Sequence, residues 1–167
     1  MSDGAGEPKP VRESMSEYSE IAMPNDANPL GTLFGGKVMQ LVDMAGSLAA
    51  FRHARRPVVT ASVDYMTFLT PVHIGQLLVL RSMVNRVFRT SMEVGVRVCV
   101  EDLMTGDIRH TSSAYLTFVA LGTDGKPVPI PPAVPETEEE KRRYEDAATR
   151  REHRLALRRK VAGRIEV

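Results

Sequence analysis

A stretch of small and apolar residues between positions 33 and 51 constrains the fold of this 167-residue chain more than any other feature. Its apolar residues recur at the three- and four-residue spacing of a helix, at Val38, Leu41, Val42, Ala45, Leu48 and Ala49. The other faces are also mostly small or apolar, and the polar residues that interrupt them are Lys37, Gln40, Asp43 and Ser47. Such a helix has to be largely buried, so we expect a central helix wrapped by a sheet.

The residues after Pro57 change from helical to alternating spacing, which predicts strands over residues 58–69, 77–88, 91–100 and 111–121. Short connectors rich in Gly, Asp and Pro join these strands, as in an antiparallel meander rather than parallel crossovers. A short first strand is expected within residues 14–23. The predicted order is β-α-β-β-β-β, an α+β fold.

The two ends of the chain differ from this centre in composition. Residues 1–14 combine glycine, proline and charge with almost nothing to bury, which predicts a flexible N-terminal arm. Five prolines in 127–135 make that segment extended, and it closes a domain spanning 15–135. A charged C-terminal helix and tail is predicted for 136–167. Thr137 and Glu140 would form its capping box, with Glu138–Arg142 and Glu139–Arg143 as ion pairs.

Charge and cysteine content exclude several classes of protein. The 22 basic and 21 acidic residues nearly cancel, which argues against a generally basic nucleic-acid binder. Cys99 is the one cysteine, so we expect no intramolecular disulfide and a reducing, cytoplasmic location. No secretory leader or apolar run of about 20 residues is seen, which argues against a membrane partner. The scattered histidines predict no metal, and the missing nucleotide-binding motifs predict no redox cofactor.

Asp43 is a carboxylate in the middle of the apolar helix, where burial without a partner is costly. It is either a structural acid that binds a loop amide or a general base or nucleophile that faces a cleft. Gly35 and Gly36 at the helix entrance form either a tight turn or a pair of bare amides that polarise a carbonyl. Asn28 precedes a proline, so it is either a turn residue or a polar group of the same site. The spacing favours a carbonyl bound at the helix N-terminus and a water activated by Asp43.

These motifs together resemble the acyl-CoA thioesterases of the hotdog superfamily. The resemblance rests on NPLGTLFGG at residues 28–36 and LVDMAG at 41–46. It continues through VTASVD at 59–64, SMEV at 91–94, FVAL at 118–121 and VPETE at 134–138, as in the cytosolic medium- to long-chain acyl-CoA hydrolases. It covers most of the chain, which holds one hotdog repeat rather than the tandem repeats of mammalian members.

The resemblance implies a homodimer with its active sites between two hotdog units, assembled further into a trimer of dimers. Each site would combine Asn28 of one unit with Asp43 of the other, and the Gly36 amide, next to Gly35, would bind the thioester carbonyl. The implied reaction hydrolyses an acyl-CoA to a fatty acid and free coenzyme A, with no separate cofactor. Asp43 would act as a general base or through a covalent anhydride.

The resemblance also implies a coenzyme A site. Arg89, Thr90 and Ser91 sit at a strand turn where relatives contact coenzyme A, although Arg89 also suits an ordinary solvated turn. Thr60, Ala61 and Ser62 would line the pantetheine tunnel or simply pack within a strand.

An alternative hypothesis is that the protein is a non-catalytic acyl-CoA sensor that carries an effector segment. Residues 150–167 hold seven Arg or Lys against two Glu, which suits either a solvated end or a polyanion-binding tail.

Overall fold

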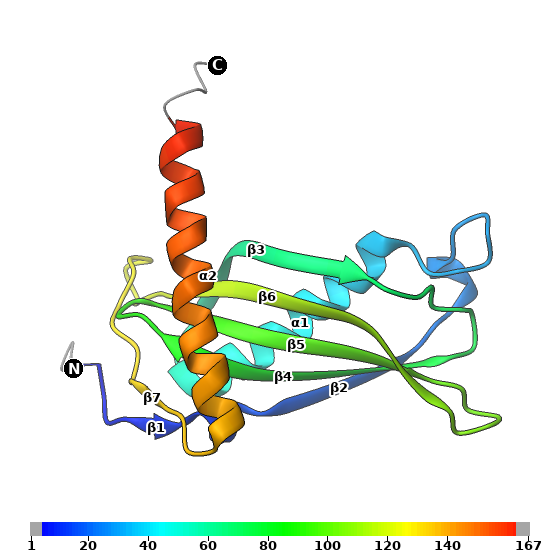
Figure 1. Ribbon diagram of the computed structural model, residues 1–167, viewed down its shortest axis with the longest axis horizontal. Coiled ribbons are helices and arrows are strands. Elements are labelled where there is room, and N and C mark those ends of the chain that lie inside the picture. The colour runs from blue at the N-terminus through cyan, green and yellow to red at the C-terminus, as the bar shows by residue number, and fades with distance from the viewer. Residues whose placement is uncertain (1–4, 163–167) are drawn as a thin grey trace.

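The computed structural model describes residues 5–162. Its elements in chain order are β1 (Lys9–Pro10), the 3-10 helix η1 (Val11–Ser14), β2 (Ser16–Ile21), the 3-10 helix η2 (Pro24–Asp26), α1 (Gly35–Ala54), β3 (Val58–Phe68), β4 (Leu77–Val87), β5 (Ser91–Glu101), β6 (Ile108–Ala120), β7 (Ala133–Val134) and α2 (Glu138–Ala162). Five strands form one antiparallel sheet in the order β2-β4-β5-β6-β3, with α1 on one face and α2 crossing the other (Figure 1). The predicted hotdog fold is confirmed.

One side of α1 packs into the curved inner face of the sheet. Its buried side chains include Val38, Leu41, Val42, Ala45 and Ala49, which lie against apolar residues of β4, β5 and β6. Gly46 permits the close approach, because a Cβ there would lie 3.2 Å from the ring of Phe118 on β6. Burial of these methyl and methylene groups is the main source of the stability of the fold.

The other side of α1 stays uncovered within one chain. Met39, Met44, Leu48 and Phe51 are each more than 40% exposed, although they belong to the stretch that is apolar around most of its circumference. One sheet can cover only one side of a helix. The predicted burial of most of the helix is therefore not reached by the chain alone, which buries one side of it and leaves an apolar face exposed.

β3 forms one edge of the sheet, and its only strand partner among the described residues is β6. The register shifts twice along this pair, between Thr60 and Ser62 and between Val63 and Tyr65. Each shift is a bulge that places one extra residue on β3, so side chains are redirected between the two faces of the sheet. Val59, Val63 and Tyr65 are more than 40% exposed along this edge.

The N-terminal segment differs from the predicted arm over residues 9–14, while residues 1–4 lie outside the described part. β1 pairs in parallel with β7 of the proline-rich segment. Val11 is fully buried, and the Ser14 hydroxyl accepts a hydrogen bond from the Val84 amide. One buried apolar side chain and a few hydrogen-bonded backbone groups are thus enough to hold this short strand and turn against the rest of the domain.

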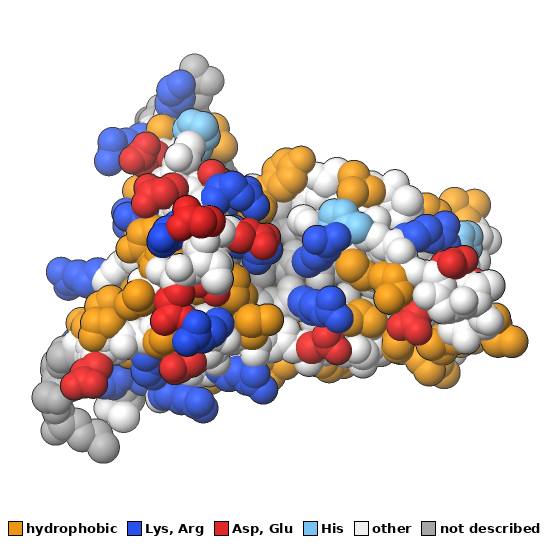
Figure 2. Space-filling model, turned by 60° about the horizontal axis from the view of Figure 1, so that its bottom comes forward, with side chains coloured by type: hydrophobic (Ala, Val, Ile, Leu, Met, Phe, Trp, Pro, Cys, Tyr) orange, Lys and Arg blue, Asp and Glu red, His pale blue; other side chains and the backbone are white. Residues whose placement is uncertain are grey.

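α2 begins with the predicted capping box, in which the Glu140 amide donates to Thr137 Oγ1 while Glu140 Oε2 accepts from the Thr137 amide. The predicted Glu139–Arg143 pair forms. Glu138–Arg142 does not, because Glu138 pairs with Lys141 instead. Figure 2 shows the helix as a band of mixed acidic and basic side chains. Ala147 is the only buried residue in the described part of α2, so the helix docks on the sheet largely through polar contacts.

The central docking contact is an ion pair between Arg150 of α2 and Glu93 of β5, whose side chain is 1% exposed. Two hydrogen bonds of 2.7 and 3.0 Å join them, and the Asn85 amide donates a third to Glu93. The guanidinium also lies 3.7 Å from the centre of the Tyr115 ring. Burial lowers the pKa of Arg150, but its hydrogen bonds and charge attraction to Glu93 outweigh this and leave that pKa raised.

Neither helix within residues 5–162 combines the length and apolarity required to span a bilayer.

Arg150→Ala should lower the free energy of unfolding by about 3–5 kcal/mol, because it leaves the Glu93 carboxylate buried without its counter-charge. Urea denaturation at pH 7 measures the change. Arg158→Ala on the exposed end of α2 is the control, with an expected change below about 0.5 kcal/mol. Equal stabilities of the two variants would contradict the role given to this ion pair.

His53 should make the fold acid-sensitive. Its ring is buried, Nε2 lies 2.8 Å from the Pro131 carbonyl, and Nδ1 has no partner among the described residues. Burial lowers the pKa of His53 below 6.5, whereas its unfolded pKa is near 6.5. The unfolded chain therefore binds the extra proton first, and stability falls as the pH drops below about 6.5. Thermal melting from pH 8 to 5 should show a smaller fall for His53→Gln than for the unchanged protein.

Candidate active site

The N-terminal end of α1 carries backbone amides without acceptors. Phe34 occupies the N-cap position and its side chain forms no capping hydrogen bond. Among the described residues the Gly35 and Gly36 N–H groups donate to no acceptor, whereas the Lys37 amide donates to the Phe34 carbonyl. These donors lie at the positive end of the helix dipole, so they can bind a carbonyl oxygen that gains negative charge.

A pocket of about 290 Å³ opens beside these amides. Its lining comes from the start of α1 and the connection between β3 and β4, and consists of Leu33, Gly35, Val38, Phe68, Leu69, Thr70, Pro71 and Val72. A Cβ at position 35 would lie 3.5 Å from the Phe68 ring, so glycine lets this ring approach the helix. The pocket offers mostly apolar contacts next to the helix end with the Gly35 and Gly36 amides, which are unpaired within the described residues.

Lys37 lies in the first turn of α1, where a cation opposes the helix dipole. Its Nζ is 2.9 Å from Glu20 Oε1 and 3.3 Å from Asp26 Oδ2. The Tyr18 hydroxyl and Lys37 donate to Glu20 and hold the pKa of that carboxyl below its usual range, while hydrogen bonds to Glu20 and Asp26 raise the pKa of Lys37. This pairing compensates the Lys37 charge and leaves the neighbouring glycine amides available.

Asn28 lies in the loop before α1 and forms the turn expected of an Asn-Pro pair. Its Oδ1 accepts hydrogen bonds of 2.9 Å from the Leu30 amide and 3.3 Å from the Thr32 amide. Its Nδ2 donates to Thr32 Oγ1, and Gly31 within the turn has φ +76°. The turn holds the half-buried Asn28 side chain at the same end of α1 as the glycine amides.

Asp43 lies half-buried in the exposed apolar face of α1, and it has a partner that sequence reasoning missed. Thr60 of β3 donates a 2.5 Å hydrogen bond from Oγ1 to Asp43 Oδ1. Within the described residues no cation lies within 4 Å of this carboxylate. Asp43 therefore keeps one oxygen available for a ligand or a water, while Thr60 orients the other. The sequence held a signal for such a partner, because a carboxylate in an apolar helix requires a hydrogen-bond donor such as a hydroxyl group.

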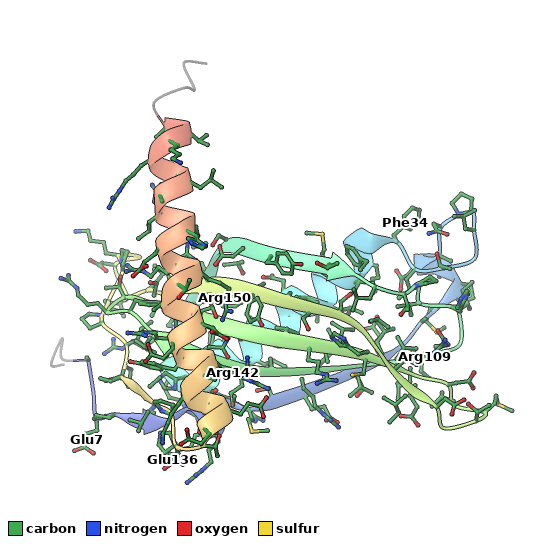
Figure 3. The ribbon with its side chains drawn as sticks, in the orientation of Figure 1. Glu7, Phe34, Arg109, Glu136, Arg142 and Arg150 are labelled. Carbon is green, nitrogen blue, oxygen red and sulfur yellow. The ribbon has the colours of Figure 1, made fainter. Side chains whose placement is uncertain are left out.

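One chain does not bring the two halves of the predicted site together. The eight residues from Gly35 to Asp43 span about 12 Å along the helix, several times the reach of a hydrogen bond. Figure 3 shows the glycine end of α1 through Phe34, the residue before it, which lies at the end of the sheet far from Arg150 on α2. Asp43 therefore does not reach a carbonyl bound at the end of its own helix, and the site that combines two hotdog units stays a prediction.

The three predicted tunnel residues divide between the faces of the sheet. Thr60 lies opposite Phe118 and points inward to Asp43. Ala61 is the exposed extra residue of the first bulge. Ser62 lies opposite Thr117, and its hydroxyl donates a 2.6 Å hydrogen bond to Asp64 on the outer face. The bulge thus places Ser62 and Thr60 on opposite faces of the sheet, and the role of Thr60, Ala61 and Ser62 in a tunnel stays a prediction.

Arg89, Thr90 and Ser91 form the tight turn between β4 and β5 and the start of β5. Arg89 is exposed and has φ +52°, an uncommon conformation for a side chain of this size. The Thr90 carbonyl accepts from the Ala120 amide and the Ser91 carbonyl accepts from the Phe88 amide. These bonds hold the turn rigidly, with the Arg89 guanidinium accessible to solvent.

No cluster of three or more His, Cys, Asp or Glu side chains suited to a metal occurs within residues 5–162.

Comparisons with known proteins identify the family of this chain. A family profile described as Thioesterase superfamily matches residues 30–106. The protein named uncharacterized acyl-CoA thioester hydrolase YkhA, from Bacillus subtilis, is 47% identical over 129 residues, which cover 77% of this chain and 75% of that protein. The crystal structure of an apo-hexameric acyl-CoA thioesterase has a TM-score of 0.87 and 43% identity, over 90% of this chain and 97% of that one.

An acyl-CoA hydrolase from Staphylococcus aureus is similar over nearly its full length. Its complex with butyryl coenzyme A, coenzyme A and coenzyme A disulfide has a TM-score of 0.88 and 36% identity, over 95% of this chain and 97% of that one. The same enzyme has been solved with alanine in place of an asparagine, an aspartate and a threonine numbered 28, 43 and 60 in that protein. The resemblance seen in the sequence is thereby confirmed, and this chain belongs to the acyl-CoA thioester hydrolases of the thioesterase superfamily.

Proposed function

We propose that this protein hydrolyses medium- to long-chain acyl-CoA thioesters to a fatty acid and free coenzyme A. The observation that carries this function is the Asp43 carboxylate, oriented by Thr60 and left accessible in an apolar helix face. An acyl chain suits the apolar surroundings, and a thioester needs only an activated water and a donor to its carbonyl. No separate cofactor is required, since coenzyme A is part of the substrate.

In the proposed mechanism Asp43 takes a proton from a water whose oxygen attacks the thioester carbonyl carbon. The oxyanion that forms accepts hydrogen bonds from the Gly36 amide and the neighbouring Gly35 amide, and the Asn28 side chain orients the water or the carbonyl. The carbon–sulfur bond then breaks, and the departing thiolate takes the proton held by Asp43. A general base and an oxyanion donor each contribute about 10²–10⁴ in rate. Direct attack by Asp43, through a covalent anhydride, uses the same residues.

A homodimer is the arrangement that unites the two halves of the site. The uncovered face of α1 and the free edge of β3 are continuous apolar and hydrogen-bonding surfaces that a second copy can cover by a two-fold axis. Asp43 and Thr60 of one copy would then meet the glycine amides and Asn28 of the other, twice per dimer. Hexameric relatives support a further assembly into a trimer of dimers.

The coenzyme A phosphates require cations near the mouth of the site. Arg89 offers an exposed guanidinium on a rigid turn, with the Thr90 and Ser91 groups beside it. Thr60 and Ala61 lie on the inner side of β3 and its edge, where the pantetheine arm would pass. The relative solved with coenzyme A derivatives supports a coenzyme A ligand here.

The Staphylococcus aureus variants support the choice of residues. The replaced asparagine, aspartate and threonine have the same types and numbers as Asn28, Asp43 and Thr60 of this chain, and the match covers 95–96% of its length.

We place the enzyme in the cytoplasm, because a single cysteine favours a reducing compartment. An acyl-CoA sensor would keep the same cleft but would not hydrolyse the thioester. A measurement of thiol release from acyl-CoA therefore separates the enzyme from the sensor.

Asp43→Ala should reduce turnover of palmitoyl-CoA by about 10²-fold or more, because no other carboxylate replaces the base. Thiol release, followed across a series of acyl-chain lengths, measures the activity. Arg158→Ala, on the exposed end of α2, is the control and should keep full activity. Unchanged turnover in Asp43→Ala would remove Asp43 from the mechanism, and absence of turnover in the unchanged protein would favour the sensor.

Mixing Asn28→Ala with Asp43→Ala chains should restore activity if each site draws on both copies. Half of the dimers formed after denaturation and refolding of an equal mixture are mixed, and one of their two sites is intact, which gives about a quarter of the normal activity. Each variant refolded alone is the control and should stay inactive. A mixture as inactive as its components would show that both residues serve a site within one chain.

A further inference from the structure

β3 depends on more than its strand pairing to hold Thr60 in place. It is an edge strand, and the two bulges at Ala61 and Asp64 leave residues of β3 without partners in the ladder with β6. Because side chains alternate along a strand, a slip of one residue would turn the Thr60 hydroxyl away from Asp43. The hydrogen bond that orients Asp43 therefore requires this stretch of β3 to be fixed from another side.

The second fixing point lies on the outer face of the sheet, at the second bulge. The Asp64 side chain is 8% exposed and accepts hydrogen bonds from the Ser62 hydroxyl at 2.6 Å and the Thr117 hydroxyl at 3.2 Å. Arg154 of α2 forms an ion pair with the same carboxylate and donates a 2.6 Å hydrogen bond to Thr117. Asp64 is thus held by donors from three elements, β3, β6 and α2.

The link from α2 to β3 is specific to Arg154. The other arginines of α2 that touch the sheet reach elsewhere, since Arg150 binds Glu93 of β5 and Arg151 lies over Phe88 at the end of β4. Among the hydrogen bonds and ion pairs of the described residues, those of Arg154 alone join α2 to β3. Four positions separate Asp64 from Thr60 along the same strand.

We propose that the Arg154–Asp64 ion pair positions the catalytic base, by fixing the bulged part of β3 from which Thr60 orients Asp43. Arg154 and Asp64 are positioning residues, because they lie on the face of the sheet opposite the site. The C-terminal helix thereby serves the reaction without contacting the substrate. This inference rests on the proposed function of Asp43 as the base.

Arg154→Ala should lower kcat for palmitoyl-CoA by about tenfold while KM changes by less than about twofold, because the base is misplaced and the binding surfaces are not. Arg154→Lys keeps the charge and should recover at least half of the lost rate. Arg158→Ala, one helical turn further along α2, removes the same charge without touching the sheet and should leave kcat unchanged.

A double-mutant cycle with Thr60→Ala tests the route of the effect. If Arg154 acts through Thr60, Arg154→Ala should lower kcat by less than about twofold in the Thr60→Ala background, against about tenfold in the unchanged one. Hydrogen exchange of the β3 amides supplies a readout besides activity, and it should quicken in Arg154→Ala but not in Arg158→Ala. Should Arg154→Ala fail to fold, Asp64→Asn replaces it in the cycle, with the same expectation.

An equal loss of kcat in both backgrounds, or an unchanged kcat with faster exchange in β3, would overturn the inference. In that case Asp43→Ala would still be inactive and the proposed function would stand. Substantial turnover by Asp43→Ala would instead overturn the proposed function, and with it the role given to Arg154.

Discussion

The central helix α1 is apolar on more sides than one sheet can cover, and the organisation of the fold follows from this. The sheet buries Val38, Leu41 and Ala45 of α1 and leaves Met39 and Phe51 exposed on the opposite side. Apolar side chains in water are unfavourable, while a carboxylate among them is costly to bury. Asp43 sits at this conflict, and Thr60 resolves it in part by donating a hydrogen bond. The exposed face is thus apolar and also carries the Asp43 carboxylate, for which we propose the role of base.

The two faces of the sheet use different physical interactions. The inner face packs aliphatic groups against α1, and the contact at Gly46 is so close that a side chain there would push against the Phe118 ring. The outer face binds α2 through arginines that meet buried carboxylates, Glu93 and Asp64. A buried ion pair adds little to the free energy of unfolding, but the removal of one partner lowers that free energy strongly. Such pairs therefore suit a contact that has to be specific. The bulges of β3 connect the two faces, because they turn Thr60 inward and Ser62 outward.

Much of the fold was predictable because its signals are local. The helical spacing in 33–51, the alternation in four strands and the capping box at Thr137 each depend on neighbours within a few residues. Asn28 and Asp43 were also candidates on local grounds, because Asn28 is a polar residue at the entrance of a helix and Asp43 is a carboxylate within an apolar stretch. The pairing of Lys9–Pro10 with Ala133–Val134 was not predictable, since two short segments 124 residues apart carry no shared pattern.

The central helix, the meander, the charged last helix and the family were all predictable from the sequence, because periodicity and motifs depend only on the order of the residues. Polar partners within one helical turn, such as Thr137 with Glu140, were predictable, whereas partners distant in the sequence were set by the tertiary fold. Thr60 meets Asp43 and Arg154 meets Asp64 because bulges and a crossing helix bring them together over 17 and 90 residues. The separation of Asp43 from the glycine amides within one chain follows instead from the predicted helix itself, without any tertiary contact. The rise of a helix sets that distance, and no spacing of motifs can shorten it.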